Sequence, residues 1–401
     1  MSEKISLKEA EDLLNFTIDN NRHLQDSEQT PIAISFTGGH GIGKTSMVEQ
    51  VARKRNMTIT KLSLHELEEV GDLIGYPVKE YKVVEKKSGK SGWVAADVLN
   101  RVDREKFNVT NESRMGYAKP AWVPQYNENG CILLLDDYAR SSSMMIQATM
   151  ELINTGKYVS WSLPKYTTLV LTANPDNGEF NIQSLDPAQR TRFMDYELEF
   201  NIDDWAYWAE ASNIDSRCIN FALQFSNELF KPQNNVTIAC PRSYVNFCKA
   251  ISGIKDWKSD LKHIMLISKG CFDDKDNAVG RIFSVFINNE LDKLISPKDV
   301  FEKSWDYVGR KLTEAINKDG DYRASVASMM ATRIVNYVDA YFDKPGYVSA
   351  PVISRIEEMF EHKSFPEDLL FYIVKSVVSR HRKQAIKLLQ NPEISNRVML
   401  S

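Results

Sequence analysis

The chain has 401 residues and an ordinary globular composition, with 43% hydrophobic and 26% charged residues. That length allows two or three domains with sizeable cores. The net charge is only −4, so no overall field favours nucleic acid or a membrane surface. No apolar run approaches the roughly 20 residues that span a bilayer, and the polar start lacks the apolar segment of a signal peptide. We therefore expect a cytoplasmic protein without a membrane contact.

The cysteines predict neither a disulfide framework nor a zinc site. Both kinds of site need clustered or paired spacing, and no two cysteines here form a CxxC pair. The odd count favours free thiols in a reducing compartment. The five positions are Cys131, Cys218, Cys240, Cys248 and Cys271.

The first half of the chain alternates strand and helix patterns. Its continuous apolar strands are typical of a parallel sheet that helices cover on both faces. A capping-box pattern, Ser6 with Glu9, marks the first helix. The expected strands are 31–37, 58–64, 130–136 and 167–173, the expected helices are 6–24, 44–54, 65–76 and 141–154, and a hairpin is expected over 157–166.

Two other regions have different patterns. Residues 79–119 are polar, lysine-rich and poor in apolar periodicity, which predicts a long insertion or surface excursion. After residue 202 the strand signals fade and the pattern is helical to the end of the chain. The expected helices are 203–213, 216–231, 242–252 and 257–270, followed by a helical segment over 297–401 with breaks near Gly320, Gly346 and Pro366.

A glycine-rich turn between the first strand and the next helix fits the pattern G-x-x-x-x-G-K-[ST]. Glycines let consecutive backbone N–H groups surround a phosphate, and the helix presents its positive end to the same anion. We expect Lys44 to reach the β- and γ-phosphates and the Thr45 hydroxyl to bind Mg²⁺. The predicted nucleotide-binding residues are Gly38, Gly39, His40, Gly41, Ile42, Gly43, Lys44, Thr45 and Ser46.

A second strand, 130–136, ends in two acidic residues. Asp136 is the expected second metal-binding residue. Asp137 follows at the position where a water-activating carboxylate is expected. Aspartate has a shorter reach than glutamate, and a displacement of about 1 Å can lower a rate roughly 100-fold. The sequence therefore predicts a Mg²⁺ site with Asp137 as a catalytic residue, and it leaves slow hydrolysis open.

From this turn to Phe193, the motifs resemble those of the AAA+ ATPases of the MoxR and dynein-related group. The resemblance covers about residues 25–255 and lies in the order of motifs. The 130–136 strand is followed by a helix, a hairpin, a strand ending Thr-Ala-Asn-Pro at 172–175, and the stretch 185–193. It implies a three-layer αβα core over 1–202 with an insertion at about 79–120. A helical lid over 203–292 and an α-helical C-terminal domain of unknown role over 293–401 would follow.

The resemblance also implies roles for three further residues. Asn174 falls on the first sensor, which orients the attacking water, and Arg242 falls on the second sensor of the lid. Arg192 falls on the arginine that reaches into the ATP site of a neighbouring subunit. Arg190 is a second candidate, because the chain has Arg-Thr-Arg where the family has one arginine. Such a finger can raise the rate about 10³- to 10⁵-fold.

The family resemblance predicts a motor that binds ATP and Mg²⁺, assembles into a ring, expected to be hexameric, and remodels a protein client. Members of the group often act with a von Willebrand factor A-type partner. Two alternatives stay open. One is a nucleic-acid-linked motor related to GTP-dependent restriction ATPases, which the near-neutral charge disfavours. The other is a nucleotide-switched scaffold with slow turnover, suggested by Asp137. Preference for ATP over GTP rests on the resemblance, because the loop contacts only phosphates.

Overall fold

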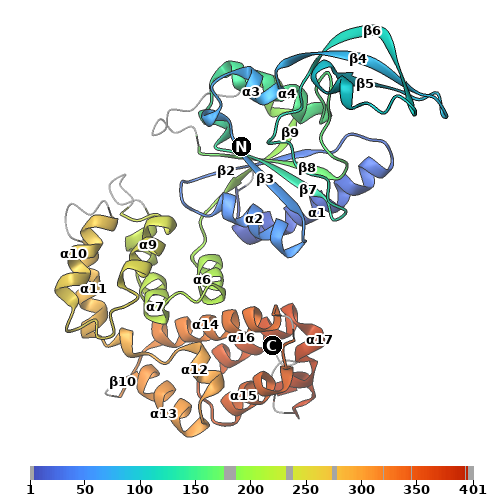
Figure 1. Cartoon of the computed structure of the whole chain (residues 1–401). Helices are drawn as coiled ribbons and strands as arrows, with labels where there is room; N and C mark the ends of the chain where they lie inside the picture. Colours follow the sequence, from blue (N-terminus) through green and yellow to red (C-terminus); the bar gives the residue numbers. More distant parts are fainter. Residues whose placement is uncertain are drawn as a thin grey trace. The chain divides into compact units, whose positions relative to one another are not determined.

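The chain folds into two compact units, Met1–Phe200 and Asn201–Ser401. The computed structural model describes residues 4–175, 187–231, 238–272, 278–318, 320–344, 346–392 and 394–395. The first unit is α/β and the second is almost entirely helical (Figure 1). Among these residues, no helix combines the length and the apolar character that crossing a bilayer requires.

The first unit is built on a six-stranded, fully parallel sheet. The sequence predicted a parallel sheet and four of these strands, but not the strands at Lys4–Ile5 and Phe193–Leu198. The strand order of the sheet is β1-β9-β2-β8-β7-β3, so β3 and the short β1 form the two edges. The predicted bounds of β2, β3, β7 and β8 are within about two residues of those observed. The strands are β1 Lys4–Ile5, β2 Ala33–Gly38, β3 Thr58–Ser63, β7 Cys131–Asp136, β8 Thr167–Ala173 and β9 Phe193–Leu198.

Helices cover both faces of this sheet and give it two separate cores. On one face, α1 (Leu7–Asp26) and α2 (Lys44–Lys54) pack against alternate strand residues such as Ile132 and Leu134. On the other face, α3 (Val70–Ile74) and α4 (Ser143–Thr155) belong to a core that includes Leu133 and Leu135. Successive strand residues point to opposite faces, so a strand buried on both faces has a continuous apolar sequence. The three-layer α/β prediction is therefore confirmed (Figure 1).

The first helix begins as its capping motif predicts. The Ser6 hydroxyl accepts a hydrogen bond from the Glu9 backbone N–H at 3.2 Å, and the Glu9 carboxylate accepts one from the Ser6 N–H at 2.8 Å. These two bonds satisfy donors that would otherwise lack partners at the helix start. The helix then runs to Asp26, two residues beyond the predicted end.

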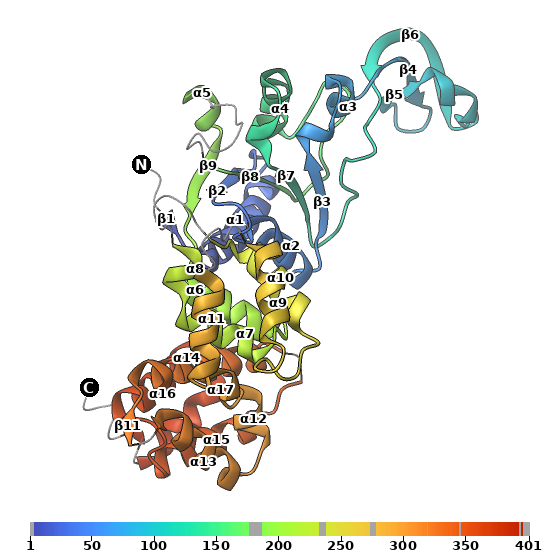
Figure 2. The ribbon, with the colours of Figure 1, turned by 90° about the vertical axis from the view of Figure 1, so that its left-hand side faces the viewer.

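The lysine-rich insertion is a folded antiparallel sheet, whereas the sequence indicated no regular structure there. Its order is β5-β4-β6, formed by β4 (Pro77–Glu85), β5 (Ser91–Ala95) and β6 (Phe107–Tyr117). Cross-strand polar contacts replace most of an apolar core. Arg114 donates to the buried Glu80 at 2.7 Å and lies over the Trp93 ring at 4.5 Å. Figure 2 shows this sheet extending from the α3 side of the unit.

The expected hairpin at 157–166 is reduced to a tight turn. One bridge joins Lys157 to Ser162, and strand β8 begins only at Thr167. Burial in this turn is irregular: Val159 is 76% exposed, while Trp161 is buried and packs edge-on against Tyr158 at 5.0 Å. The Tyr158 and Trp161 rings both pack toward the core from neighbouring positions of the turn. The segment therefore lacks the alternation of a regular strand.

The second unit is a helical bundle, as predicted after residue 202. The predicted 216–231 helix is divided at Phe225, and a short two-stranded ladder, Asn317–Lys318 with Asp321–Tyr322, lies at the expected break near Gly320. Its helices are α6 Ile202–Ala211, α7 Ser216–Gln224, α8 Ser226–Phe230, α9 Pro241–Ile251, α10 Leu261–Cys271, α11 Ala278–Asn288, α12 Pro297–Glu302, α13 Trp305–Ile316, α14 Ala324–Phe342, α15 Ser349–Glu361, α16 Glu367–Arg380 and α17 Arg382–Ala385.

A buried charged pair connects the two halves of this bundle. Arg333 of α14 donates through Nε to Glu210 of α6 at 2.6 Å and through Nη1 to Asn220 of α7 at 2.6 Å. The Arg333 side chain is 2% exposed and that of Glu210 is 10% exposed. The predicted lid (203–292) and C-terminal domain (293–401) are thus joined by a charged contact inside one compact unit. Their separation into two domains stays a prediction.

Candidate functional site

The glycine-rich turn lies between the end of β2 and the start of α2. Gly41 and Gly43 have φ angles of 71° and 109°, which residues with a side chain rarely adopt. A Cβ on Gly38 would lie 2.8 Å from the Leu198 carbonyl oxygen, so the turn needs glycine there too. Gly43 occupies the N-cap of α2 and has no side chain with which to cap it. The first N–H groups of α2 are therefore suited to bind an anion.

The other residues of the turn would act through their backbone. Ile42 is 8% exposed, and its side chain packs in the core of the unit. His40 and Ser46 are exposed to solvent, and Gly39 is half-buried. Main-chain amides are therefore the chemical groups that these positions offer to a phosphate.

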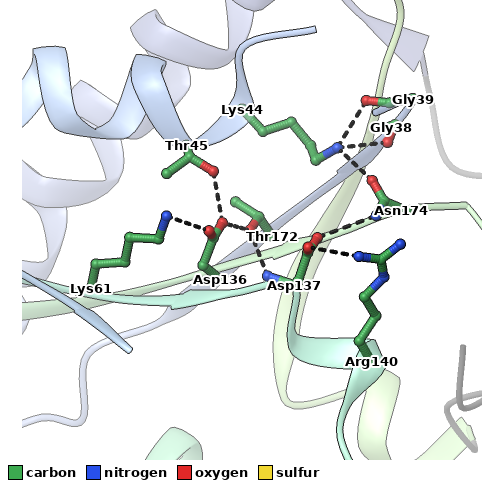
Figure 3. A network of polar contacts seen from close by, with 10 residues as sticks. All are labelled: Gly38, Gly39, Lys44, Thr45, Lys61, Asp136, Asp137, Arg140, Thr172 and Asn174. Carbon is green, nitrogen blue, oxygen red and sulfur yellow. Dashed lines mark hydrogen bonds and ion pairs between the residues drawn. The ribbon is translucent and has the colours of Figure 1, made fainter. Parts of the chain in front are cut away.

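Lys44 is nearly buried and bends back over the loop. Its ammonium donates to the carbonyl oxygens of Gly38 and Gly39 at 2.7 and 2.9 Å, and to Oδ1 of Asn174 at 3.0 Å (Figure 3). The side chain is thus held at the mouth of the loop beside the end of β8. A phosphate in the loop would offer this ammonium a charge-assisted partner in place of neutral oxygens.

Asp136, at the end of β7, is surrounded by donors. Its Oδ1 accepts hydrogen bonds from the hydroxyls of Thr45 and Thr172, both at 2.7 Å, and its Oδ2 pairs with the Lys61 ammonium at 2.8 Å. Burial alone would raise the pKa of the Asp136 carboxyl, but the bonds from its three neighbours, Lys61 first, lower it below the ordinary value. The carboxylate is therefore held ionised and fixed in orientation (Figure 3).

The oxygen ligands that Thr45 and Asp136 offer suit a hard divalent cation. A hydroxyl and a carboxylate oxygen lie 2.7 Å apart, and Mg²⁺ prefers oxygen ligands. Among the described residues, no group of three or more His, Cys, Asp or Glu side chains gathers in a metal-binding arrangement. Phosphate oxygens and water would therefore supply the remaining ligands, which is how Mg²⁺ usually binds with nucleotides.

Asp137 lies next to this cluster in an unusual backbone conformation. Its φ and ψ are 50° and 40°, in the left-handed region. Its Oδ1 accepts a hydrogen bond from Asn174 Nδ2 at 3.2 Å, and its Oδ2 lies 3.5 Å from Arg140 Nη1. Its backbone N–H donates to the Thr172 hydroxyl at 3.2 Å. Asn174 thus contacts both Lys44 and Asp137 and connects the loop to the acids at the end of β7.

The predicted arginine fingers lie far from this cluster. Arg192 directly precedes β9, whose first residue pairs with Ala33, whereas Leu198 pairs with Gly38 of the loop. Five residues of strand separate those two pairs, which is roughly 17 Å. Arg192 and Arg190 are both exposed. They cannot reach the loop of their own subunit without a large rearrangement. Residues 185 and 186 of the motif lie outside the described residues.

Arg242 belongs to the second unit. It lies in the first turn of α9, directly after Pro241, and its side chain is exposed. Its role as the second sensor stays a prediction.

Three residues of the cluster were not identified from the sequence: Thr172, Lys61 and Arg140. Thr172 precedes the expected sensor by two residues, so it points to the same side of β8, and this spacing could have identified it. Lys61 lies in an edge strand of mixed polarity, Thr-Ile-Thr-Lys-Leu-Ser, where a lysine gives no signal of its own. Its partner Asp136 is distant in sequence and becomes a neighbour only through the β3–β7 pairing.

Comparisons with known proteins give only weak likenesses. No family model and no curated protein matches the chain. Two Thermotoga maritima RuvB structures resemble it. One, a point mutant, is 14% identical, with 81% of this chain and 91% of that chain covered at a TM-score of 0.35. The other, described as a Holliday junction branch migration motor, is 15% identical, with 74% and 75% covered at a TM-score of 0.35. A Cytophaga hutchinsonii protein described as a presumed ATPase is 15% identical, with 92% and 84% covered at a TM-score of 0.27.

Proposed function

We propose that this chain is an AAA+ ATPase that binds ATP with Mg²⁺ and hydrolyses it as one subunit of a ring. The observation that carries the proposal is the convergence of Lys44, Thr45, Asp136 and Asn174 at the ends of three adjacent strands and one helix. A glycine-rich turn without an ammonium, a hydroxyl and two acids beside it would bind an anion at most. Together these groups can bind a triphosphate and act on it.

Each residue has a distinct role in this mechanism. The α2 N-terminus and the loop amides bind the phosphates, and Lys44 moves from the loop carbonyls to the β- and γ-phosphates. Thr45 and Asp136 would hold Mg²⁺, which neutralises phosphate charge when it is bound. Asp137 accepts the proton of the attacking water, and Asn174 orients that water. The short reach of Asp137 makes turnover slow compared with a glutamate at this position.

The ring is proposed from the place of Arg192. Roughly 17 Å of strand β9 separates the residue after Arg192 from the end of the sheet at the loop, so an exposed arginine there would act as a finger in a neighbouring subunit. A closed ring gives every site such a neighbour, and head-to-tail contacts close into rings when the rotation allows. We propose a hexamer that uses the cycle to remodel a protein client, with a von Willebrand factor A-type protein as a candidate partner.

The test is phosphate release by the purified chain with ATP and with GTP. Lys44→Ala and Arg192→Ala should each abolish turnover, and mixing the two should restore part of it, because each contributes the half that the other lacks. The turnover of Arg190→Ala, compared with that of Arg192→Ala, shows which of the two arginines is the finger. Arg101→Ala, an exposed arginine in the insertion, is the matched control and should be neutral.

A different result would contradict the proposal. If the wild type binds ATP but turns over no faster than Lys44→Ala, the motor hypothesis fails for the isolated chain, and Asp137→Glu then tests whether reach is the cause. If nucleic acid stimulates the rate strongly, the client assignment is wrong.

A further inference from the structure

Lys61 makes a contact that nucleotide binding does not require. It lies on β3, the edge strand of the central sheet, and its side chain runs toward the end of β7. Its Nζ lies 2.8 Å from Oδ2 of Asp136. Figure 3 shows Lys61 and Thr172 on opposite sides of that carboxylate, with Thr45 also donating to it. Both oxygens of the proposed metal carboxylate are therefore occupied by protein donors.

Stability does not explain this ion pair. The Lys61 side chain is 45% exposed, and it lines an open cleft of about 370 Å³ together with Glu49, Arg53 and Ile59. Partly exposed ion pairs contribute at most about 1 kcal/mol to folding. The pair does have a large electrostatic consequence for the site, since it joins a unit positive charge to its one strongly fixed carboxylate.

We infer that Lys61 is a positioning residue that keeps the metal site from collecting a divalent cation before a nucleotide arrives. The inference rests on the proposed function. Lys61 occupies Oδ2, so Asp136 can serve a metal only through Oδ1, on the side shared with Thr45. Its ammonium also offsets the charge of that carboxylate, and Lys44 and Arg140 lie close to the second acid, Asp137, so these side chains carry no excess negative charge that would attract a divalent cation. Polyphosphate brings the charge and the oxygen ligands that make cation binding favourable.

This arrangement makes metal binding depend on nucleotide binding. With Lys61 in place, Asp136 is a charge-compensated carboxylate and the neighbouring Asp137 lies 3.5 Å from Arg140, so the side chains alone make a poor site for a divalent cation. Without it, Asp136 would present a free oxygen and an uncompensated charge. The side chain that lowers affinity for the free cation would also keep the Asp136 carboxylate aimed at Thr45, so productive geometry survives the arrival of the metal.

The experiment is a titration of the full chain with Mn²⁺, followed by the loss of the free Mn²⁺ signal in electron paramagnetic resonance, with and without ADP. Lys61→Met should bind Mn²⁺ without ADP about tenfold more tightly than the wild type, because a repelling charge has been removed. Lys61→Arg keeps the charge and should behave as the wild type. Lys54→Met, which breaks an exposed pair with Glu11, is the matched control.

A double variant tests whether the increased Mn²⁺ affinity of Lys61→Met comes from the Asp136 carboxylate. Adding Asp136→Asn to Lys61→Met should return Mn²⁺ binding without ADP to the wild-type level, since the released carboxylate is then gone. A melting temperature close to that of the wild type confirms that each variant is folded.

The outcomes separate this inference from the proposed function. The inference is overturned if, without ADP, Lys61→Met binds Mn²⁺ no more tightly than the wild type. It is also overturned if Lys61→Arg increases the Mn²⁺ affinity as much as Lys61→Met does. The proposed function stands in both cases as long as ADP promotes Mn²⁺ binding. If ADP promotes no Mn²⁺ binding in the wild type, the proposed function fails, and the inference fails with it.

Discussion

Two carboxylate–cation pairs, one in each unit, have opposite electrostatic character. Asp136 and Lys61 are 15% and 45% exposed, and their contact lowers the pKa of the acid and raises that of the lysine. Glu210 and Arg333 are 10% and 2% exposed, and burial raises the pKa of the acid and lowers that of the arginine. In the first pair the hydrogen bonds outweigh desolvation, whereas in the second desolvation dominates.

This difference indicates what each pair does. A partly hydrated pair at the end of a parallel sheet can be altered at little cost in stability, so it can set the charge of a binding site. A pair enclosed in a helical bundle cannot, because removing either partner leaves a charge without water. The first pair is therefore suited to control binding, and the second to hold helices together. Substitutions that affect binding and stability separately test this difference.

The largest expected effect is on the buried pair. Arg333→Met leaves the Glu210 carboxylate enclosed without its cation, and losing one partner of such a pair costs about 3–5 kcal/mol of unfolding free energy. Urea unfolding should show this loss, with faster amide exchange in α6 and α14. Adding Glu210→Leu should recover part of the stability, because the stranded charge is removed.

An exposed pair in the same unit provides the control. Lys298 and Glu302 lie 4.0 Å apart on α12, and Lys298→Met should change stability by less than about 1 kcal/mol. If Arg333→Met lowers the unfolding free energy by no more than Lys298→Met does, the buried pair does not stabilise the bundle. The two carboxylate–cation pairs would then not differ in function.

A smaller effect is expected at Thr172, and it should appear in the rate. The Thr172 hydroxyl donates to Asp136 and accepts from the Asp137 N–H, so it fixes both acids at once. Thr172→Val keeps the shape and loses both bonds. We expect kcat to fall about tenfold, equivalent to about 1.4 kcal/mol of transition-state stabilisation, with nucleotide affinity nearly unchanged. Steady-state kinetics and a binding titration measure the two quantities separately.

Thr172→Ser tests whether the hydroxyl is responsible. It restores both hydrogen bonds and should recover most of the rate. A parallel loss of affinity and rate in Thr172→Val, or no rescue by serine, would mean that Thr172 matters for packing rather than for positioning the acids.

The sequence predicted what depends on local chemistry. The bounds of α1 and α2 follow from the Ser6–Glu9 capping motif and from the glycine turn, both of which involve residues close together in the chain. The parallel sheet follows from continuous apolar strands. The position of Lys44 follows from the glycine turn that precedes α2, and that of Asp136 from the end of an apolar strand.

The remaining features depend on contacts between distant residues. The insertion appeared irregular because its strands are polar and are held by cross-strand pairs such as Glu80 with Arg114, 34 residues apart. Glu210 and Arg333 are 123 residues apart, and no pattern in either helix indicates the other. Lys61 likewise has no local signal for its partner. Such pairs follow from tertiary packing, which a single sequence does not display.

The smallest expected effect concerns a solvent-exposed counterpart of the buried pair. Glu290 accepts from Lys318 at 2.9 Å and from Lys293 at 3.0 Å, and these bonds lower its pKa from an ordinary 4.5 to about 2. A depressed folded-state pKa adds stability that is present above the unfolded pKa and is lost as pH falls through the folded one. The wild type should therefore exceed Glu290→Gln slightly in stability near neutral pH, and the difference should shrink between about pH 4.5 and 2. Urea unfolding at a series of pH values measures it, with Glu302→Gln as the control. A difference that stays constant to pH 2 would show that the two lysines do not stabilise the Glu290 carboxylate, and exposed pairs in this unit would then have no measurable role beside the buried one.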